Sequence, residues 1–120
     1  MKEQVSLLIA GAPLAADARL ARSLARDFAL VEWADDLPTA ERLLPRCHFD
    51  CIVVHVESPQ DPALGWISRV RREAGPGPTI LVAAGADAGL AAAARRAGAT
   101  GCVASPLDAA ALREAYDGRS

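Results

Sequence analysis

The sequence lacks a long hydrophobic run and a cysteine framework. No apolar run reaches the roughly 18 residues that a membrane span needs, and Met1-Lys2-Glu3-Gln4 leads straight into a short strand-like run. We therefore expect neither a membrane segment nor a signal sequence. The three cysteines are irregularly spaced, which does not fit the paired pattern of a secreted disulfide scaffold. We expect a cytoplasmic protein with reduced thiols.

Aromatic residues and excess charge are also scarce. Aromatics make up 4% of the 120 residues, and the net charge is −2. Neither a broad basic surface nor rows of stacking rings are indicated, so we expect no direct binding to nucleic acid or to a membrane. The length fits one small domain with a single core. Much of the 52% hydrophobic share is alanine, which favours close contacts between helices and sheet.

The apolar pattern predicts strands alternating with helices. Strands are expected where short apolar runs end at Gly or Pro, at residues 5–9, 29–33, 51–56, 79–83 and 101–104. Helices are expected where apolar residues recur at helical spacing, at residues 14–28, 37–44, 64–72, 90–97 and 107–116. Before the second helix, Asp35-Asp36 offers an N-cap and Pro38 suits a first turn.

This alternation predicts the fold class. Five strands and five helices in one short chain favour an α/β single domain, a doubly wound five-stranded parallel sheet of the flavodoxin-like kind. The expected strand order is 2-1-3-4-5, whose functional crevice lies at the carboxyl ends of strands one and three. Ala10, Gly11 and His55 would lie there.

Three stretches resemble a known family. Residues 49–59, ending at Pro59, resemble the third strand and following loop of the receiver domains of bacterial response regulators, the CheY-like family. Residues 78–84 resemble its fourth strand, and residues 97–108 its approach to the last helix. There Ser105-Pro106 stands where the family has a Lys-Pro pair, and the resemblance implies a cis peptide at this bond. The spacing is similar to that of pseudo-receiver domains, including those of amidase-type antiterminators.

The resemblance also implies that the family's chemistry is missing. The positions that match its phosphorylation pocket are Ala10, Gly11, His55, Ala83, Cys102 and Ser105. In the family, the first two are acidic and hold Mg²⁺, the third is the phosphate-accepting Asp, and the others are the switch hydroxyl, the switch aromatic and the Lys. Together, these changes remove the ligands of the metal, the acceptor of the phosphoryl group, the Lys that neutralises its charge and the residues that respond to it. We therefore expect a degenerate pseudo-receiver with no cofactor, no metal and no aspartyl phosphorylation.

His55 allows several interpretations. A neutral imidazole that fills the vacated pocket and hydrogen-bonds to the backbone or Glu57 is the favoured one. A phosphohistidine, a pH sensor and a ligand contact made with Glu57 stay open. Cys47, His48, Cys51 and His55 look like a metal set, but Cys51 and His55 would lie about 13 Å apart on one strand. That distance is too long for one zinc ion.

The arginines form clusters that could lie on a solvated face or on a surface that binds a partner. Arg69, Arg71 and Arg72 cluster on one expected helix, and Arg95-Arg96 on another; a solvated face is favoured, with a partner surface as the alternative. In the resembling family, receivers signal and dimerise through the elements that match residues 90–97, 101–104 and 107–116. Arg95 and Arg96 could pair there with Asp108 or Glu114 of a second copy.

Two classes of function follow. The first is a non-enzymatic, phosphorylation-independent module for protein interaction or dimerisation in bacterial signal transduction or transcription regulation. The second is a small-ligand-binding or enzymatic domain that uses His55, Glu57 and Ser105 in the crevice. Because family members often continue into an output domain, residues 1–120 are expected to form a pseudo-receiver domain, alone or as the N-terminal part of a longer regulator.

Overall fold

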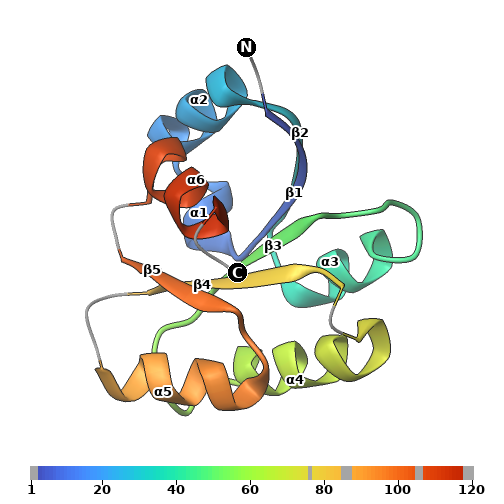
Figure 1. The fold of residues 1–120 in the computed structure, drawn as a ribbon, viewed down its shortest axis with the longest axis vertical. Helices are drawn as coiled ribbons and strands as arrows, with labels where there is room; N and C mark the ends of the chain where they lie inside the picture. Colours follow the sequence, from blue (N-terminus) through green and yellow to red (C-terminus); the bar gives the residue numbers. More distant parts are fainter. Residues whose placement is uncertain (1–2, 76, 85–87, 105–106, 118–120) are drawn as a thin grey trace.

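The computed structural model describes residues 3–75, 77–84, 88–104 and 107–117, which form a central sheet covered by helices on both faces (Figure 1). The strands are β1 (Glu3–Ala10), β2 (Phe28–Ala34), β3 (Cys51–His55), β4 (Thr79–Ala84) and β5 (Gly101–Ala104). The helices are α1 (Ala12–Ala15), α2 (Ala18–Asp27), α3 (Leu37–Leu43), α4 (Ala63–Ala74), α5 (Ala88–Ala97) and α6 (Ala109–Asp117). All strand pairs are parallel, in the order β2-β1-β3-β4-β5. The predicted fold class and strand order are confirmed.

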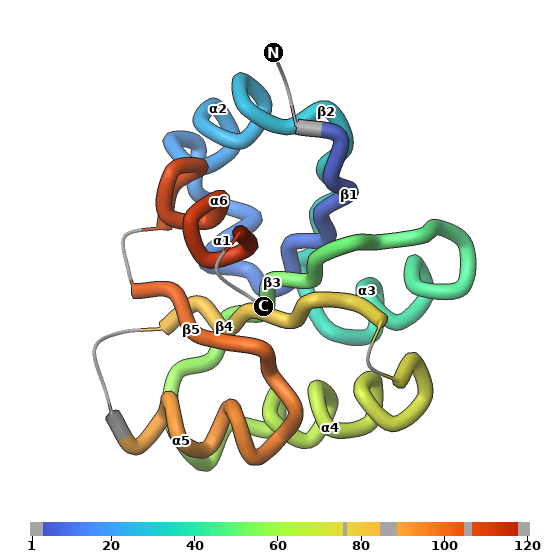
Figure 2. The backbone as a smooth tube through the Cα atoms, in the orientation of Figure 1, coloured from blue at the N-terminus to red at the C-terminus, as the bar shows by residue number. Residues whose placement is uncertain are grey.

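The helices form two layers, one on each side of the sheet (Figure 2). Alternate residues of each strand point to opposite faces. Ile52 and Val54 of β3 therefore join the core beneath α3, α4 and α5, whereas Cys51 and Val53 join the core beneath α1, α2 and α6. Residues 51–54 are all buried, as their continuous apolar run predicts for a strand covered on both faces. Trp66 of α4 is 4% exposed and packs against the sheet.

The single helix expected over residues 14–28 is wrong in detail. The chain forms the short α1, which has Pro13 in its first turn, and then the separate helix α2. Asp17 causes the break because its extended backbone ends the first helix, while its side chain accepts hydrogen bonds from Arg19 N and Leu20 N. The sheet resumes at Phe28, directly after α2.

Two aspartates fix the start of α3 and of β3. Asp36 caps α3 by accepting a hydrogen bond from Thr39 N at 2.8 Å, which confirms the predicted cap. A hydrogen bond with the Thr39 side chain, together with this backbone hydrogen bond, lowers the pKa of Asp36 below its ordinary value. Asp50 accepts from Ser6 N at 3.0 Å and lies 3.2 Å from His48 Nε2, so it ties β1 to the beginning of β3.

No helix in the described part of the chain is long and apolar enough to cross a membrane.

Candidate functional site

The crevice predicted at the carboxyl ends of β1 and β3 brings Ala10, Gly11, His55 and Ala83 together. Ala10 pairs with Val54 in the sheet, so the next residue, Gly11, lies beside His55. His55 is the last residue of β3 and pairs with Ala83 of β4. Gly11 N donates to Ala34 O at 2.9 Å, which fixes the turn that leaves β1. The sheet therefore brings these four residues to one edge.

Gly11 and His55 are in direct contact. A Cβ atom built on Gly11 would lie only 2.7 Å from Cβ of His55, closer than two carbon atoms can approach. Gly11 also has φ of 126°, a conformation that side chains with a Cβ rarely adopt. The crevice is therefore filled at this point by the base of the His55 side chain, and only glycine fits opposite it.

The imidazole of His55 faces Glu57. Its Nε2 lies 3.5 Å from Oε1 of Glu57, and the two side chains are 23% and 76% exposed. Ion pairs with this much solvent access contribute about 0–1 kcal/mol. Asp61 orders the loop around them, because its carboxylate accepts from Glu57 N and Ala63 N, each at 2.9 Å. The structure thus brings His55 and Glu57 near each other, and the expected hydrogen bond of the imidazole stays a prediction.

The residues that match the family's switch positions lie in different environments. Ala83 is buried, with 1% exposure, and its methyl group offers no hydroxyl. Cys102 is exposed on β5; partial burial raises the pKa of its thiol, and the nearby Arg95 guanidinium opposes this shift. Ser105 and the Ser105–Pro106 peptide, for which a cis bond was expected, lie outside the described residues.

The residues of the crevice do not fit the magnesium ion that receiver domains hold. Mg²⁺ needs oxygen ligands in near-octahedral geometry. Neither Ala10 nor Gly11 carries a side-chain oxygen, and the contact with His55 leaves no room for a side chain at position 11. Across residues 3–75, 77–84, 88–104 and 107–117, no group of three or more His, Cys, Asp or Glu side chains could hold a metal.

The four cysteine and histidine residues considered as a metal set are dispersed. Cys51 is buried in the core, and Cys47 is exposed in the loop before β3. His48 pairs with Asp50 instead of turning toward a thiol. Cys51 therefore acts as a small core residue, as free cysteine often does.

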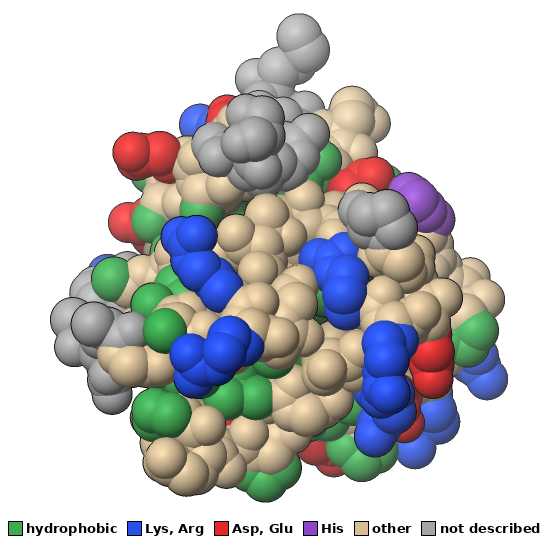
Figure 3. Space-filling view, turned by 60° about the horizontal axis from the view of Figure 1, so that its bottom comes forward, with side chains coloured by type: hydrophobic (Ala, Val, Ile, Leu, Met, Phe, Trp, Pro, Cys, Tyr) green, Lys and Arg blue, Asp and Glu red, His purple; other side chains and the backbone are tan. Residues whose placement is uncertain are grey.

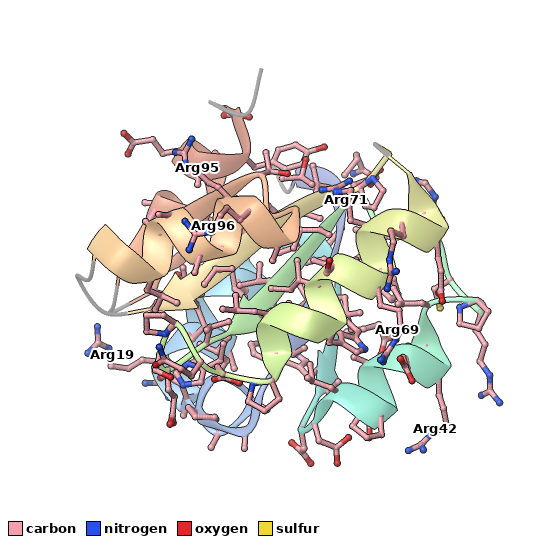
Figure 4. The ribbon with its side chains drawn as sticks, turned by 90° about the horizontal axis from the view of Figure 1, so that it is seen from below. Arg19, Arg42, Arg69, Arg71, Arg95 and Arg96 are labelled. Atoms are coloured by element: carbon pink, nitrogen blue, oxygen red, sulfur yellow. The ribbon has the colours of Figure 1, made fainter. Side chains whose placement is uncertain are left out.

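The expected interface residues are exposed, but they belong to elements on opposite faces of the sheet, at the edge formed by β5. Arg95 and Arg96 lie at the end of α5, whereas Asp108 precedes α6 and Glu114 lies within it. Figure 4 shows Arg95 directed toward the α6 side of α5 and Arg96 on the underside of the same helix. Asp108 also caps α6, because its Oδ1 accepts from Ala111 N at 2.8 Å.

Arg71 differs from the other arginines. Its Nε donates to Gly98 O at 3.0 Å, Nη1 to Gly75 O at 2.9 Å, and Nη2 to Thr100 Oγ1 at 3.4 Å. Burial lowers the pKa of this guanidinium from its ordinary value. The predicted solvated face is therefore wrong for Arg71, which joins the end of α4 to the turn between α5 and β5. The signal in the sequence was Gly98, whose missing side chain leaves room for the Arg71 stem.

Sequence reasoning also missed a groove at the other end of the sheet. A hollow of about 1030 Å³ lies between α3 and the end of α4, over the segments that enter β3 and β4. Its lining includes Leu44, Phe49, Ile52 and Val70. The groove was not foreseen because Val70 is distant in the sequence from Leu44, Phe49 and Ile52, and only the fold brings it to them.

The fold is that of solved response-regulator receiver domains. No protein-family model matches the chain, and no curated protein is similar to it in sequence. Solved structures do match. The chemotaxis response regulator CheY4 of Vibrio cholerae has a TM-score of 0.80 and 18% identity, with 98% of this chain and 100% of that chain covered.

Two further receiver structures extend the comparison. An atypical orphan response regulator, described as having a phosphorylation-independent regulatory mechanism, has a TM-score of 0.73 and 21% identity over 95% of this chain and 92% of that one. The beryllofluoride-activated NtrC4 receiver domain dimer has a TM-score of 0.76 and 21% identity over 96% and 98%. At these identities the likeness establishes the fold.

Proposed function

We propose that residues 1–120 form a pseudo-receiver domain that acts without phosphorylation, as a module for protein interaction or dimerisation in bacterial signal transduction or transcription regulation. The observation that carries this proposal is the contact between Gly11 and His55 inside a receiver fold. It occupies the place where a receiver domain needs a metal ligand beside its phosphate acceptor.

The electrostatics of the crevice support the same conclusion. Phosphoryl transfer to a carboxylate needs cationic groups that neutralise the developing charge. The described crevice offers the Glu57 carboxylate beside the acceptor position, and this carboxylate would repel a phosphate. Ala83 has no hydroxyl that could follow a phosphoryl group after transfer. The frame of the domain is therefore retained without the groups that would drive its switch.

The interaction role rests on the surface of α5, β5 and α6. Arg95 and Arg96 of α5 and Asp108 and Glu114 at α6 are all exposed, so a second copy could place opposite charges against each other. Exposed pairs contribute about 0–1 kcal/mol each. They would fix orientation, and apolar contact would supply most of the affinity. The similarity to an orphan regulator described as phosphorylation-independent and to a receiver dimer supports this role.

The first experiment tests phosphorylation. Beryllofluoride or acetyl phosphate with Mg²⁺ is added to the ¹⁵N-labelled domain, and amide chemical shifts are followed. We expect no saturable shifts near His55. The variant His55→Asp, which restores only the acceptor, should also fail to bind because the metal ligands are still missing. Saturable, Mg²⁺-dependent shifts around the crevice of the parent protein would refute the proposal.

The second experiment tests the interface. Reversing Arg95 and Arg96 to Glu should weaken self-association in sedimentation while leaving the thermal midpoint nearly unchanged. The control reverses Arg22 and Arg26, two exposed arginines of α2, and changes the net charge equally. A parent protein that is monomeric at all concentrations, or equal effects of the two double variants, would exclude a homodimer through this surface.

The alternative, a small-ligand-binding or enzymatic domain, has one observation in its favour. The His55 imidazole keeps partial solvent access and lies near a carboxylate, an arrangement that can hold a polar ligand. The close contact between Gly11 and His55, which fills part of the crevice, counts against this alternative. If His55→Gln abolished binding or turnover of a small molecule while leaving self-association intact, this alternative would replace the interaction module.

A further inference from the structure

The strand β2 forms one edge of the sheet and presents backbone groups that are not hydrogen-bonded. It pairs with β1 on one side only. Gly11 N donates to Ala34 O, so the N–H and C=O groups of Ala34 point toward β1. Because backbone groups alternate in direction along a strand, those of Ala29, Val31 and Trp33 point away from the sheet. No hydrogen bond from outside the sheet reaches these three residues in the described part of the chain.

The strand β2 also lacks the usual features that keep edge strands from pairing. Natural edge strands are often short, or they carry Pro or Lys. β2 has seven residues and contains no Pro, Gly, Lys or Arg, whereas the other edge strand, β5, has four residues. The exposed large hydrophobic residue of the described chain, Leu30, lies on β2 and is 54% exposed. An edge of this kind is a template for pairing with another strand.

The helical face formed by α4 and α5 offers less to a second copy. Figure 3, in which these helices face the reader, shows basic side chains spread over this face and hydrophobic side chains in small, separate patches. Burial of apolar surface is the main favourable contribution to most protein association. The described part of this face is therefore a poorer surface for self-association than β2.

We propose that β2 pairs with β2 of a second copy, antiparallel across a two-fold axis, so that two five-stranded sheets join into one. In such a contact the same surface of both copies is used. The contact is separate from the proposed α5–β5–α6 surface, because β2 and β5 form opposite edges of the sheet. Both contacts can therefore exist in one assembly.

The backbone and the charges select one register. With Val31 on the two-fold axis, Val31 meets its own copy, Ala29 meets Trp33, and Leu30 meets Glu32. All seven residues of β2 are then paired, and the outward residues exchange about six hydrogen bonds. Moving the axis by one residue, to Leu30 or to Glu32, leaves about four. An axis at Glu32 also places two carboxylates directly opposite each other, which is destabilising.

The side chains fit this register on both faces of the joined sheet. On one face, the small side chain of Ala29 lies opposite the larger, half-buried indole of Trp33. On the other face, Leu30 lies opposite Glu32, whose methylene groups can contact the leucine while the carboxylate stays in water. Glu32 has no hydrogen bond or ion pair in the described part of the chain. The pairing therefore covers Leu30 without burying a charge.

The first set of variants removes or restores single contacts of this register. Ala29→Pro removes an outward N–H, and Phe28 before it has φ of −126° and ψ of 137°, which suits a following proline. Leu30→Glu places a second carboxylate opposite Glu32. Leu30→Glu/Glu32→Lys restores a pair of opposite charge, and Leu30→Gln is the neutral control.

Sedimentation velocity measures self-association of each variant. The same changes are repeated in the Arg95→Glu/Arg96→Glu protein, so that this contact and the α5–β5–α6 surface are measured separately. We expect Ala29→Pro and Leu30→Glu each to weaken association about tenfold, because each change acts twice across the two-fold axis. Leu30→Gln should weaken association less than Leu30→Glu does, and the charge-swapped variant should recover it. Thermal midpoints should stay near that of the parent, because Ala29 and Leu30 are exposed.

Amide hydrogen exchange, followed by NMR at low and high protein concentration, tests the register directly. The amides of Ala29, Val31 and Trp33 should exchange more slowly at high concentration. The amides of Leu30 and Glu32, which face β1, should not change.

Several results would overturn the proposal. Unchanged exchange at the three outward amides, or unchanged association of both Ala29→Pro and Leu30→Glu, would refute it and leave the α5–β5–α6 surface standing. A parent protein that is monomeric at all concentrations would refute both contacts. Equal protection of the three amides by an alternating Thr-Val peptide at the same concentration would show that the edge accepts any strand, and would overturn its assignment to a second copy.

Discussion

Replacing Gly11 with Ala tests how the crevice is built. The new Cβ would lie 2.7 Å from Cβ of His55, about 1 Å inside normal carbon contact. Overpacking of this kind costs about 1–3 kcal/mol. The φ of 126° adds a conformational cost of about 1–3 kcal/mol for any residue with a Cβ. We expect a loss of about 3–5 kcal/mol, a large part of a total stability of about 5–15 kcal/mol.

Chemical denaturation followed by circular dichroism measures this loss directly. Gly65→Ala is the matched control, because Gly65 lies within α4 with nothing near its side-chain position. There the substitution should stabilise the protein by about 0.5–1 kcal/mol. The two glycine-to-alanine changes are thus predicted to have opposite signs.

A double-mutant cycle separates the two costs. In a His55→Gly background the colliding Cβ is absent, so Gly11→Ala should lose only the conformational part, about 1–3 kcal/mol. In a His55→Ala background the Cβ remains, and the full cost should remain. If Gly11→Ala costs less than about 1 kcal/mol, or the same in all three backgrounds, the contact does not fill the crevice. An aspartate at position 11 would meet the same obstacle, so single substitutions should not rebuild a magnesium site.

Three more predictions follow from other contacts. Arg71→Met should destabilise the domain by about 2–3 kcal/mol, since charged hydrogen bonds are lost. The neighbouring control Arg72→Met should change the thermal midpoint little. Equal shifts of the midpoint in the two variants would contradict the role of Arg71. The pKa of Asp36 is lowered in the folded state, so its carboxylate should stabilise the protein at pH values above its ordinary pKa of 3.8. This stabilisation should be lost as the pH falls through the lowered pKa. The difference in thermal midpoint between the parent protein and Asp36→Ala should shrink only in that acid range. Iodoacetamide at mildly alkaline pH should modify Cys47 before Cys102, because burial raises the pKa of the Cys102 thiol; peptide mass spectrometry that finds the reverse order would contradict this reasoning.

The strand order and the crevice could be predicted because they depend on local patterns. The buried run at residues 51–54 and the turn residues that follow each strand specify a parallel sheet, and the sheet brings Gly11 to His55. The break at Asp17 was missed because Leu20, Leu24 and Phe28 keep helical spacing across the expected helix. The pattern does not reveal that Phe28 already belongs to β2.

The roles of the arginines could not be predicted from the sequence. Arg69, Arg71 and Arg72 look alike along the chain, yet one pairs with Glu41, one is held by backbone carbonyls and one is exposed. These differences depend on which element packs beside each side chain. Helical periodicity indicates which face is buried, but it does not identify the neighbour. The α3–α4 groove escaped prediction for the same reason.

The hydrogen bonds of Arg71 have a mechanical consequence. Gly98 and Thr100 follow α5, and Thr100 Oγ1 also accepts from Ile80 N at 3.1 Å, so the end of α5 is anchored to α4 and to β4 at once. The carboxyl end of α5 is therefore a fixed point about which any tilt of the helix would turn. With ten residues and a rise of about 1.5 Å per residue, α5 is about 15 Å long. A tilt of about 10° would therefore displace its first turn by about 2.5 Å, a movement comparable to the helix shifts that carry signals between protein surfaces.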